Sequence, residues 1–214
     1  MTMRKPLIIV GAGGLGRVVY DVLVNDPGFC ERYTLAGFLD TRPGLRLPED
    51  IALPVLGSPL EHVVQADQVF IPAVGDPAWR ERLLAPLLEQ GAQLASYCQG
   101  AFIGARTRIG AGSFLTPGAV VSVDSVIGRC AYIDTQAVLG HDVTLGDHVM
   151  LGAGVFLAGG VTVGQGASIH PRAIIAKDVR IGDGATVGIG SVVVNDVPAG
   201  VTVFGNPARI IFSK

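Results

Sequence analysis

Two histidines of the chain stand next to aspartates, and both pairs could move a proton. His141 precedes Asp142, and His148 follows Asp147, inside a glycine- and valine-rich region. An imidazole titrates near neutral pH, and a neighbouring carboxylate can fix its tautomer and support the cation that forms on proton uptake. Each pair could therefore act as a general base with an orienting acid. Which pair does so depends on where the surrounding elements point the side chains.

A six-residue period fixes the positions of both pairs. Every sixth residue after Tyr97, as far as Val193, is Ile, Leu or Val, and a second series from Ala101 to Val197 holds only Ala, Ser, Thr or Val. This period fits a β-solenoid with one short strand and one corner per hexad. We therefore expect a left-handed parallel β-helix with three hexads per coil and the aliphatic series, Tyr97 included, pointing inward. Glycines after the aliphatic residues are expected to supply the permissive backbone angles of the corners.

This register separates the two histidine–aspartate pairs. His141 falls at the corner after the inward Leu139 and should point outward with Asp142 beside it, whereas His148 should point outward on the next face. One coil above His141 lies Gly159, where a bare backbone amide could approach a thioester as an oxyanion donor. His141 is therefore the predicted base, and His148 is a secondary candidate.

The remaining histidines and the cysteines carry little chemistry. His170 directly follows an inward isoleucine and is interpreted as structural, and His62 lies outside the repeat with no evident partner. No serine or cysteine is paired with a histidine in a way that suggests an acyl-enzyme, so direct attack of an acceptor on a thioester is simpler. Widely spaced Cys30, Cys98 and Cys130 fit reduced thiols in a cytoplasm, and no metal site is expected.

The first part of the chain has a different rhythm, in which strands alternate with helices. Strands are expected at 7–10, 35–40 and 68–74, and helices at 15–26, stopped by Pro27-Gly28, and at 76–91, capped by Asp76. This alternation predicts a small parallel α/β domain, a half-Rossmann unit. The predicted domains are residues 1–95, the β-helix at 96–197, and a C-terminal tail at 198–214 that caps the solenoid.

The run GAGGLG, residues 11–16, follows the first expected strand and opens the first helix, as a dinucleotide-binding loop does. Its amides could bind a phosphate or pyrophosphate, which makes Gly11, Gly13 and Gly14 candidate ligands. Asp40 ends the second strand, where an acidic residue would meet a ribose. NAD would fit such a loop, as would a nucleotide-linked sugar, and a mere tight turn is the structural alternative. With no second mononucleotide half, the NAD reading is disfavoured.

Composition excludes several classes of protein. The chain has 214 residues, of which 49% are hydrophobic and 16% charged, and its formal net charge is -2. A disordered chain would be less apolar and more charged. The charge gives no reason to expect a nucleic-acid or anionic-membrane partner. Neither a membrane span nor a signal segment is expected, because no apolar run reaches about 18 residues and the apolar start is short.

The motifs together resemble a known family, the bacterial sugar O- and N-acyltransferases of the sialic acid O-acetyltransferase type. The similarity covers nearly the whole chain: IIVGAGGLGRVVYDVL at the start, GFLD, a histidine followed by an acid and then VTLG, and DVPAGVTVFGNPARI at the end. The resemblance implies a cytoplasmic homotrimer with acetyl-CoA between neighbouring prisms and a nucleotide-sugar acceptor on the N-terminal domain. His141 would be the base, Asp142 its partner and Gly159 the oxyanion donor. CoA would run past Lys177 towards Arg209.

Two positions depart from the family pattern. Members commonly carry a histidine in the glycine loop, where this chain has Leu15, and this leaves the identity of the acceptor open. Some members place a second histidine nine residues after the base, a position that Met150 occupies here. His148 lies two positions earlier and does not replace it in the register.

The leading hypothesis is an acetyl-CoA-dependent N-acetyltransferase that acts on a nucleotide-activated amino sugar in surface-glycan synthesis. An O-acetyltransferase on sialic acid or another sugar hydroxyl is the alternative, and acyl groups other than acetyl remain open. A non-catalytic trimeric scaffold that holds a nucleotide sugar is a hypothesis of another class. An NAD enzyme would bind NAD and not acetyl-CoA.

Overall fold

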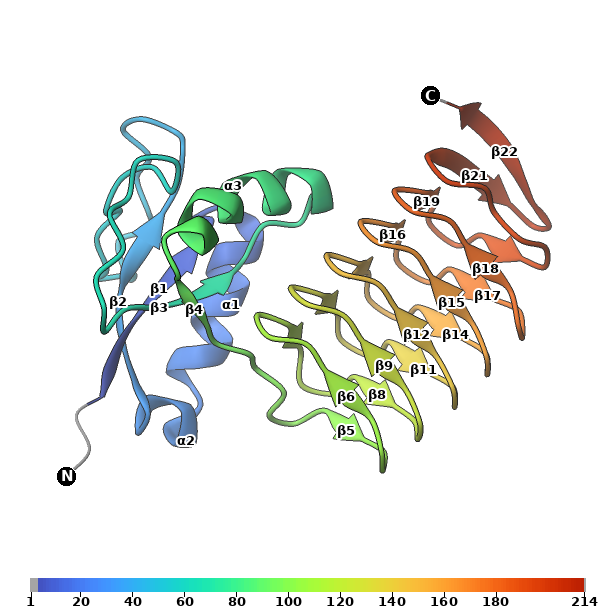
Figure 1. The fold of residues 1–214 in the computed structure, drawn as a ribbon, viewed down its shortest axis with the longest axis horizontal. Helices are drawn as coiled ribbons and strands as arrows, with labels where there is room; N and C mark the ends of the chain where they lie inside the picture. The colour runs from blue at the N-terminus through green and yellow to red at the C-terminus, as the bar shows by residue number, and fades with distance from the viewer. Residues whose placement is uncertain (1–3, 214) are drawn as a thin grey trace. The chain divides into compact units, whose positions relative to one another are not determined.

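A computed structural model describes residues 4–213 of the chain (Figure 1). The chain divides into two compact units, Met1–Ala95 and Ser96–Lys214. The fold class is the predicted one, a small α/β unit followed by a hexapeptide-repeat parallel β-helix.

The first unit is built on a four-stranded parallel sheet in the order β2-β1-β3-β4. Its strands are β1 (Lys5–Val10), β2 (Tyr33–Leu39), β3 (Val69–Pro72) and β4 (Gln93–Leu94). Its helices are α1 (Gly14–Val24), α2 (Pro27–Cys30) and α3 (Pro77–Glu89). The last four residues of β1 and all of β3 are apolar and buried, so they form the core of this unit.

Two glycines set the packing between the first strand and the first helix. A Cβ on Gly16 would lie 2.1 Å from the carbonyl oxygen of Gly11, so only a glycine lets α1 approach the loop this closely. Gly11 itself has φ +110°, and a Cβ there would lie 2.6 Å from the carbonyl oxygen of Ala73. The glycine loop is thus held tightly between β1 and the chain that leaves β3.

The predicted ends of the helices are correct for α3 and wrong after α1. Asp76 caps α3 as predicted, and its carboxylate accepts a hydrogen bond from the Trp79 amide at 2.7 Å. Helix α1, however, ends at Val24, before Pro27-Gly28 is reached. Pro27 begins the short helix α2, which the sequence reading missed, because proline is favourable at the first helical position and Asp26 caps that turn.

The second unit is the solenoid, in which residues eighteen apart pair in parallel, for example Val138 with Phe156. Three stacks of two-residue strands form its faces. The first contains β5 (Phe102–Ile103), β8 (Val120–Val121), β11 (Val138–Leu139), β14 (Phe156–Leu157), β17 (Ile174–Ile175) and β20 (Val192–Val193). The second contains β6 (Arg108–Ile109), β9 (Val126–Ile127), β12 (Thr144–Leu145), β15 (Thr162–Val163) and β18 (Arg180–Ile181).

The third face continues into the C-terminal hairpin. It contains β7 (Phe114–Leu115), β10 (Tyr132–Ile133), β13 (Met150–Leu151), β16 (Ser168–Ile169), β19 (Thr186–Val187), β21 (Val201–Gly205) and β22 (Ala208–Ser213). Strand β21 pairs with β19 in parallel, and β22 pairs with β21 antiparallel. The three faces are called below by their outer members, the β5–β20, β6–β18 and β7–β22 faces.

The inward series is buried through the middle of the solenoid and changes at its ends. From Leu115 to Val193 each inward side chain is at most 2% exposed, whereas Ile103 in the first coil is 36% exposed because a coil covers it on one side only. Tyr97 was predicted to point inward, and this is wrong. It pairs with the outward Phe114 and stacks on its ring, with 4.9 Å between the ring centroids. Val197 pairs with Ile181, so it belongs to the aliphatic column and not to the small series.

The residue that turns each corner also differs from the prediction. The left-handed backbone falls at the third residue after each aliphatic one from Ile103 to Val187, as in Asp142 (φ +58°) and Gly160 (φ +74°). The glycine directly after the aliphatic residue has another role. A Cβ on Gly140 would lie 2.7 Å from the Gly159 nitrogen of the next coil, so these glycines allow neighbouring coils to approach.

Candidate active site

The corner between β11 and β12 carries His141 and Asp142. Their side chains meet with 2.6 Å between Nδ1 and Oδ2, and both are more than half exposed. Because the carboxylate accepts from an Nδ1–H, the tautomer with its lone pair on Nε2 is favoured. This leaves Nε2 able to accept a proton.

The imidazole lies against Gly159, one coil above. A Cβ on Gly159 would stand 2.6 Å from Nε2 of His141, so the ring occupies the space that any larger side chain would need. The amide of Gly160 donates to the carbonyl oxygen of His141 at 2.9 Å, which fixes the two coils in register. Within residues 4–213 the Gly159 amide itself makes no hydrogen bond. The corner therefore places a basic nitrogen beside a backbone donor.

Charged residues line the same corner in the coils below and above. Asp124, one coil below Asp142, and Arg106, two coils below, form a bidentate ion pair with 2.7 Å between Nη2 and Oδ2, and this hydrogen bond lowers the pKa of Asp124. Two coils above His141, Lys177 lies 3.9 Å from Asp178 and is 69% exposed. Sequence reasoning missed Arg106 and Asp124. The signal was available, since both lie at multiples of eighteen residues from Asp142.

The second histidine–aspartate pair lies at a different corner, between β12 and β13. His148 is only 8% exposed, so its side chain is largely covered by the protein and is not solvated. Met150 lies on β13, on the β7–β22 face, between Tyr132 and Ser168 of the neighbouring coils. The structure thus does not bring His148 or Met150 to the corner that holds His141.

The two remaining histidines lie elsewhere. His170 is exposed at the end of β16. His62 has a partner that the sequence did not reveal: its Nε2 lies 2.9 Å from Oε1 of Gln68, and its ring meets Phe70 edge-on. These contacts support a structural role for His62.

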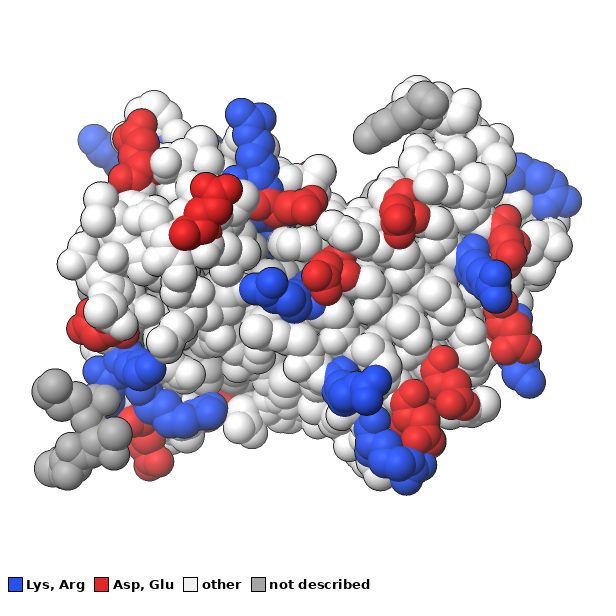
Figure 2. Space-filling model, in the orientation of Figure 1, with Lys and Arg blue, Asp and Glu red and all other residues white. Residues whose placement is uncertain are grey.

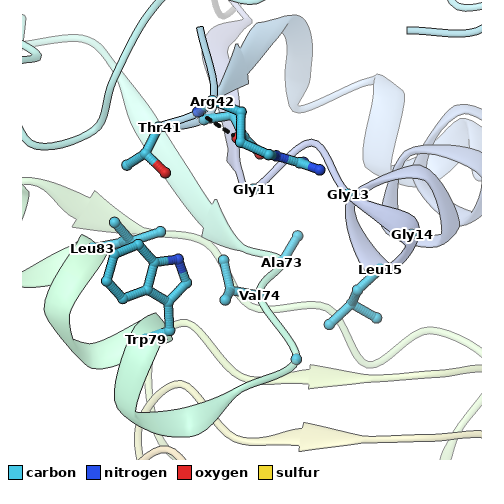
Figure 3. A pocket seen from close by; sticks show the side chains of 12 residues that line it. Gly11, Gly13, Gly14, Leu15, Thr41, Arg42, Ala73, Val74, Trp79 and Leu83 are labelled. Atoms are coloured by element: carbon cyan, nitrogen blue, oxygen red, sulfur yellow. Dashed lines mark hydrogen bonds and ion pairs between the residues drawn. The ribbon is translucent and has the colours of Figure 1, made fainter. Parts of the chain in front are cut away.

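The glycine loop opens on a cavity of about 390 Å³ in the first unit (Figure 3). Gly11, Gly13, Gly14 and Asp40, the four residues singled out in the sequence, all line it. Trp79, Leu83 and Leu15 add an apolar part to the wall. A cavity with backbone amides on one side and an aromatic ring on the other suits a ligand with a polar and a flat apolar part.

The carboxylate of Asp40 is already engaged within the protein. Its Oδ2 accepts from the Ala12 amide at 2.9 Å, and both oxygens accept from the guanidinium of Arg42 at 2.8 Å. The hydrogen bond from Arg42 is the main reason that the pKa of Asp40 falls to about 2. Sequence reasoning missed Arg42, although its place two residues after Asp40 in DTR was a usable signal.

Arg209 lies on β22, far along the chain from the other candidates. Its guanidinium donates to the carbonyl oxygen of Ala208 at 2.9 Å. It lines a small cavity of about 180 Å³ together with Asn195, Asp196 and Pro198. Lys177 is not among the residues that line this cavity.

Two kinds of feature are absent from the described part of the chain. Among residues 4–213, no three His, Cys, Asp or Glu side chains gather closely enough to hold a metal ion. Within the same range, none of the helices has the length and apolar character of a membrane-spanning segment.

Comparisons with known proteins agree with both units. Residues 6–87 match the PglD N-terminal domain, and residues 124–159 match the bacterial transferase hexapeptide model of six repeats. No curated protein matches the sequence.

Solved structures match over almost the full length. One is a mutant of perosamine N-acetyltransferase from Caulobacter crescentus in complex with CoA and GDP-perosamine, 32% identical over 97% of each chain with a TM-score of 0.85. Another is the acetyltransferase domain of PglB from Neisseria gonorrhoeae FA1090, 29% identical over 97% of this chain and 100% of that one, with a TM-score of 0.87. WeeI from Acinetobacter baumannii AYE is 30% identical over 96% and 99% of the chains, with a TM-score of 0.82. The chain therefore belongs to the family of hexapeptide-repeat sugar acyltransferases that these proteins represent.

Proposed function

We propose that this protein transfers an acetyl group from acetyl-CoA to the amino group of a nucleotide-activated sugar. The observation that carries the proposal is the His141–Asp142 pair packed against the bare amide of Gly159. The full-length similarity to an N-acetyltransferase that binds CoA and GDP-perosamine supports it. Synthesis of a surface glycan is the expected setting for such a product.

The corner provides the parts that amine acylation requires. The amine of the sugar attacks the thioester carbonyl, and Nε2 of His141 accepts the proton that the amine loses. Asp142, held at 2.6 Å from Nδ1, supports the imidazolium that forms. The Gly159 amide donates to the carbonyl oxygen as it becomes negative. When the C–S bond breaks, the amide product forms and the CoA thiolate takes the proton from His141.

The donor and the acceptor would use different units. Lys177 lies two coils above His141 with its ammonium exposed, and there it suits a phosphate of CoA. Arg209 beside the cavity on β22 is a second candidate for the same molecule. The nucleotide of the acceptor would occupy the cavity of the glycine loop.

A homotrimer is part of the proposal, and the β5–β20 face supports it. Every outward side chain of this face is apolar; they are Phe102, Val120, Val138, Phe156, Ile174 and Val192. Phe102, Phe156 and Ile174 are 63%, 44% and 45% exposed, although an apolar stripe of this length is normally covered. His141 follows the strand β11 of this face. A second copy on the stripe would therefore border the site.

Surface charge fits small-molecule substrates better than a polyanion. On the face drawn in Figure 2, acidic and basic side chains are interspersed and separated by wide uncharged areas. A nucleic-acid site would concentrate basic residues in one patch. We further propose a cytoplasmic location, where acetyl-CoA is made; Cys30 and Cys98, which form no disulfide, support it.

The test is a panel of acceptors assayed by the release of CoA thiol. GDP-, UDP- and dTDP-linked 4-amino sugars are compared with the same nucleotide sugars that carry a hydroxyl at that carbon. Thiol release with at least one amino sugar, and none with its hydroxyl counterpart, is the expected result. Turnover of hydroxyl sugars alone would instead establish O-acetylation. Binding of nucleotide sugars without any transfer would establish a scaffold.

A further inference from the structure

The carboxylate that a dinucleotide fold normally offers to a ribose is closed off in this protein. Asp40 directly follows β2. Its two carboxylate oxygens accept four hydrogen bonds, one from the Ala12 amide and three from Arg42. Its side chain is only 9% exposed, while that of Arg42 is 56% exposed. The polar group that this segment presents to a ligand is thus a cation.

The guanidinium is held in a defined position over the glycine loop. Arg42 uses Nε and Nη2 for Asp40, which fixes the plane of the group. The same Nη2 lies 3.5 Å from the position that a Cβ on Gly13 would take. Figure 3 shows the side chain extending from the Thr41 segment towards Gly13. The remaining N–H groups therefore lie beside the backbone that opens α1.

Arg42 also stands where two cavities meet. The cavity of the glycine loop, about 390 Å³, and a second one of about 610 Å³ share Asp40, Thr41 and Arg42 as wall residues. The second cavity extends along Pro43, Leu45 and Leu60. In a nucleotide sugar the diphosphate is the middle of the molecule, with the nucleoside on one side and the sugar on the other. Arg42 occupies the matching middle position between the two cavities.

We propose that Arg42 is a specificity-determining residue that binds the diphosphate of the nucleotide sugar, and that Asp40 is a positioning residue that holds the guanidinium for it. The inference rests on the proposed function for the identity of the ligand. A lysine could not replace the arginine, because one ammonium cannot satisfy both Asp40 oxygens and a phosphate in fixed geometry.

The experiment measures binding of guanosine, GMP and GDP, and of uridine, UMP and UDP, by titration calorimetry without acetyl-CoA. For at least one base, the wild-type protein is expected to bind the diphosphate more tightly than the monophosphate and the nucleoside. Arg42→Ala should weaken diphosphate binding by about 10- to 100-fold, as expected for charge-assisted hydrogen bonds, and leave the nucleoside unchanged. Arg42→Lys should recover only part of the loss.

Two further variants separate the effect of the position of the Arg42 guanidinium from that of the positive charge of the segment. Asp40→Asn keeps the arginine but weakens its anchor, so it should reduce the preference for the diphosphate without changing the affinity for the nucleoside. Arg46→Ala removes an equal charge from the same segment and lines neither cavity, so it should bind like the wild type. Circular dichroism and thermal unfolding establish that each variant is folded.

The outcomes distinguish this inference from the proposed function. Diphosphate affinity that is unchanged in Arg42→Ala, or no diphosphate binding by the wild type, would overturn the role of Arg42 even if acetyl transfer occurs. Preference for the diphosphate that depends on Arg42 would support the role even if no sugar is acetylated.

Discussion

At the scale of single residues, the direction of each nitrogen of His141 is the deciding feature. Nδ1 is engaged by Asp142, and Nε2 is directed to the space beside Gly159. A solvated surface histidine without a catalytic role would not require a glycine opposite its ring. The same pair in reverse order, Asp147-His148, lacks this arrangement because His148 is buried at another corner.

Replacing the base tests its role directly. His141→Ala should lower turnover by about 10² to 10⁴, the usual contribution of a general base, while binding of acetyl-CoA is retained. Initial rates and calorimetry with acetyl-CoA measure the two effects. His170→Ala removes an exposed histidine of the same solenoid and should leave the rate unchanged. Equal rates for His141→Ala and the wild type would contradict the assignment.

Two glycines of the same pair of coils should respond differently to an added methyl group. Gly159→Ala would place Cβ 2.6 Å from Nε2 of His141, an exposed ring that can rotate away, so we expect a large loss of rate with little loss of stability. Gly140→Ala would place Cβ 2.7 Å from the Gly159 nitrogen, which cannot move alone, so stability should fall by about 1–3 kcal/mol. Urea unfolding and initial rates separate the effects, and a severe loss of stability in Gly159→Ala would contradict this account.

At the scale of elements, the hexad period predicted the buried aliphatic column and the spacing of the corners, but not which residue of each corner takes the left-handed backbone. An inward aliphatic residue every sixth position leaves one register only, so the face of His141 could be derived from the sequence. The two ends of the solenoid were not predicted correctly. Tyr97 and Val197 follow the six-residue period in sequence, but their strand pairing places them in other columns than the period predicts. The ion pair between Asp40 and Arg42 was also not predicted, because the path of a loop after a strand follows no sequence period.

The corners impose a measurable backbone cost where they lack glycine. Gln136 has φ +58° and is exposed, whereas Gly154, at the same corner one coil later, has φ +66°. Gln136→Gly should therefore stabilise the protein, and Gly154→Ala should destabilise it, each by about 1 kcal/mol. The free energies of unfolding in urea measure both changes. A loss of stability in Gln136→Gly would contradict the strain at this corner.

At the scale of the whole molecule, the proposed sites lie on two different units. The α/β unit carries the cavity with Arg42, and the solenoid carries the histidine corner and the apolar stripe. The stripe is continuous from β5 to β20, whereas the equivalent positions of the β6–β18 face include Arg108, Thr144, Thr162 and Arg180. Only the first of these two faces is suited to association.

The proposed trimer should be sensitive to charge on this stripe. Phe156→Arg places a charge on the β5–β20 face and should convert trimers to monomers in analytical ultracentrifugation. Thr162→Arg makes the matching change on the β6–β18 face, at a strand position that is also exposed, and should remain trimeric. A wild-type monomer, or a trimeric Phe156→Arg variant, would exclude this face as the interface.

The eighteen-residue register also fixes the distances between equivalent side chains along the solenoid. Paired strands lie about 4.8 Å apart, so each coil advances an equivalent side chain by one such step and keeps it on the same face. Lys177 stands two steps from His141 on the same corner. Adding or removing a whole coil between them would change this span by one step and keep every side chain on its face. The length of donor that can reach both residues is therefore set by counting coils, and it can change only in whole steps.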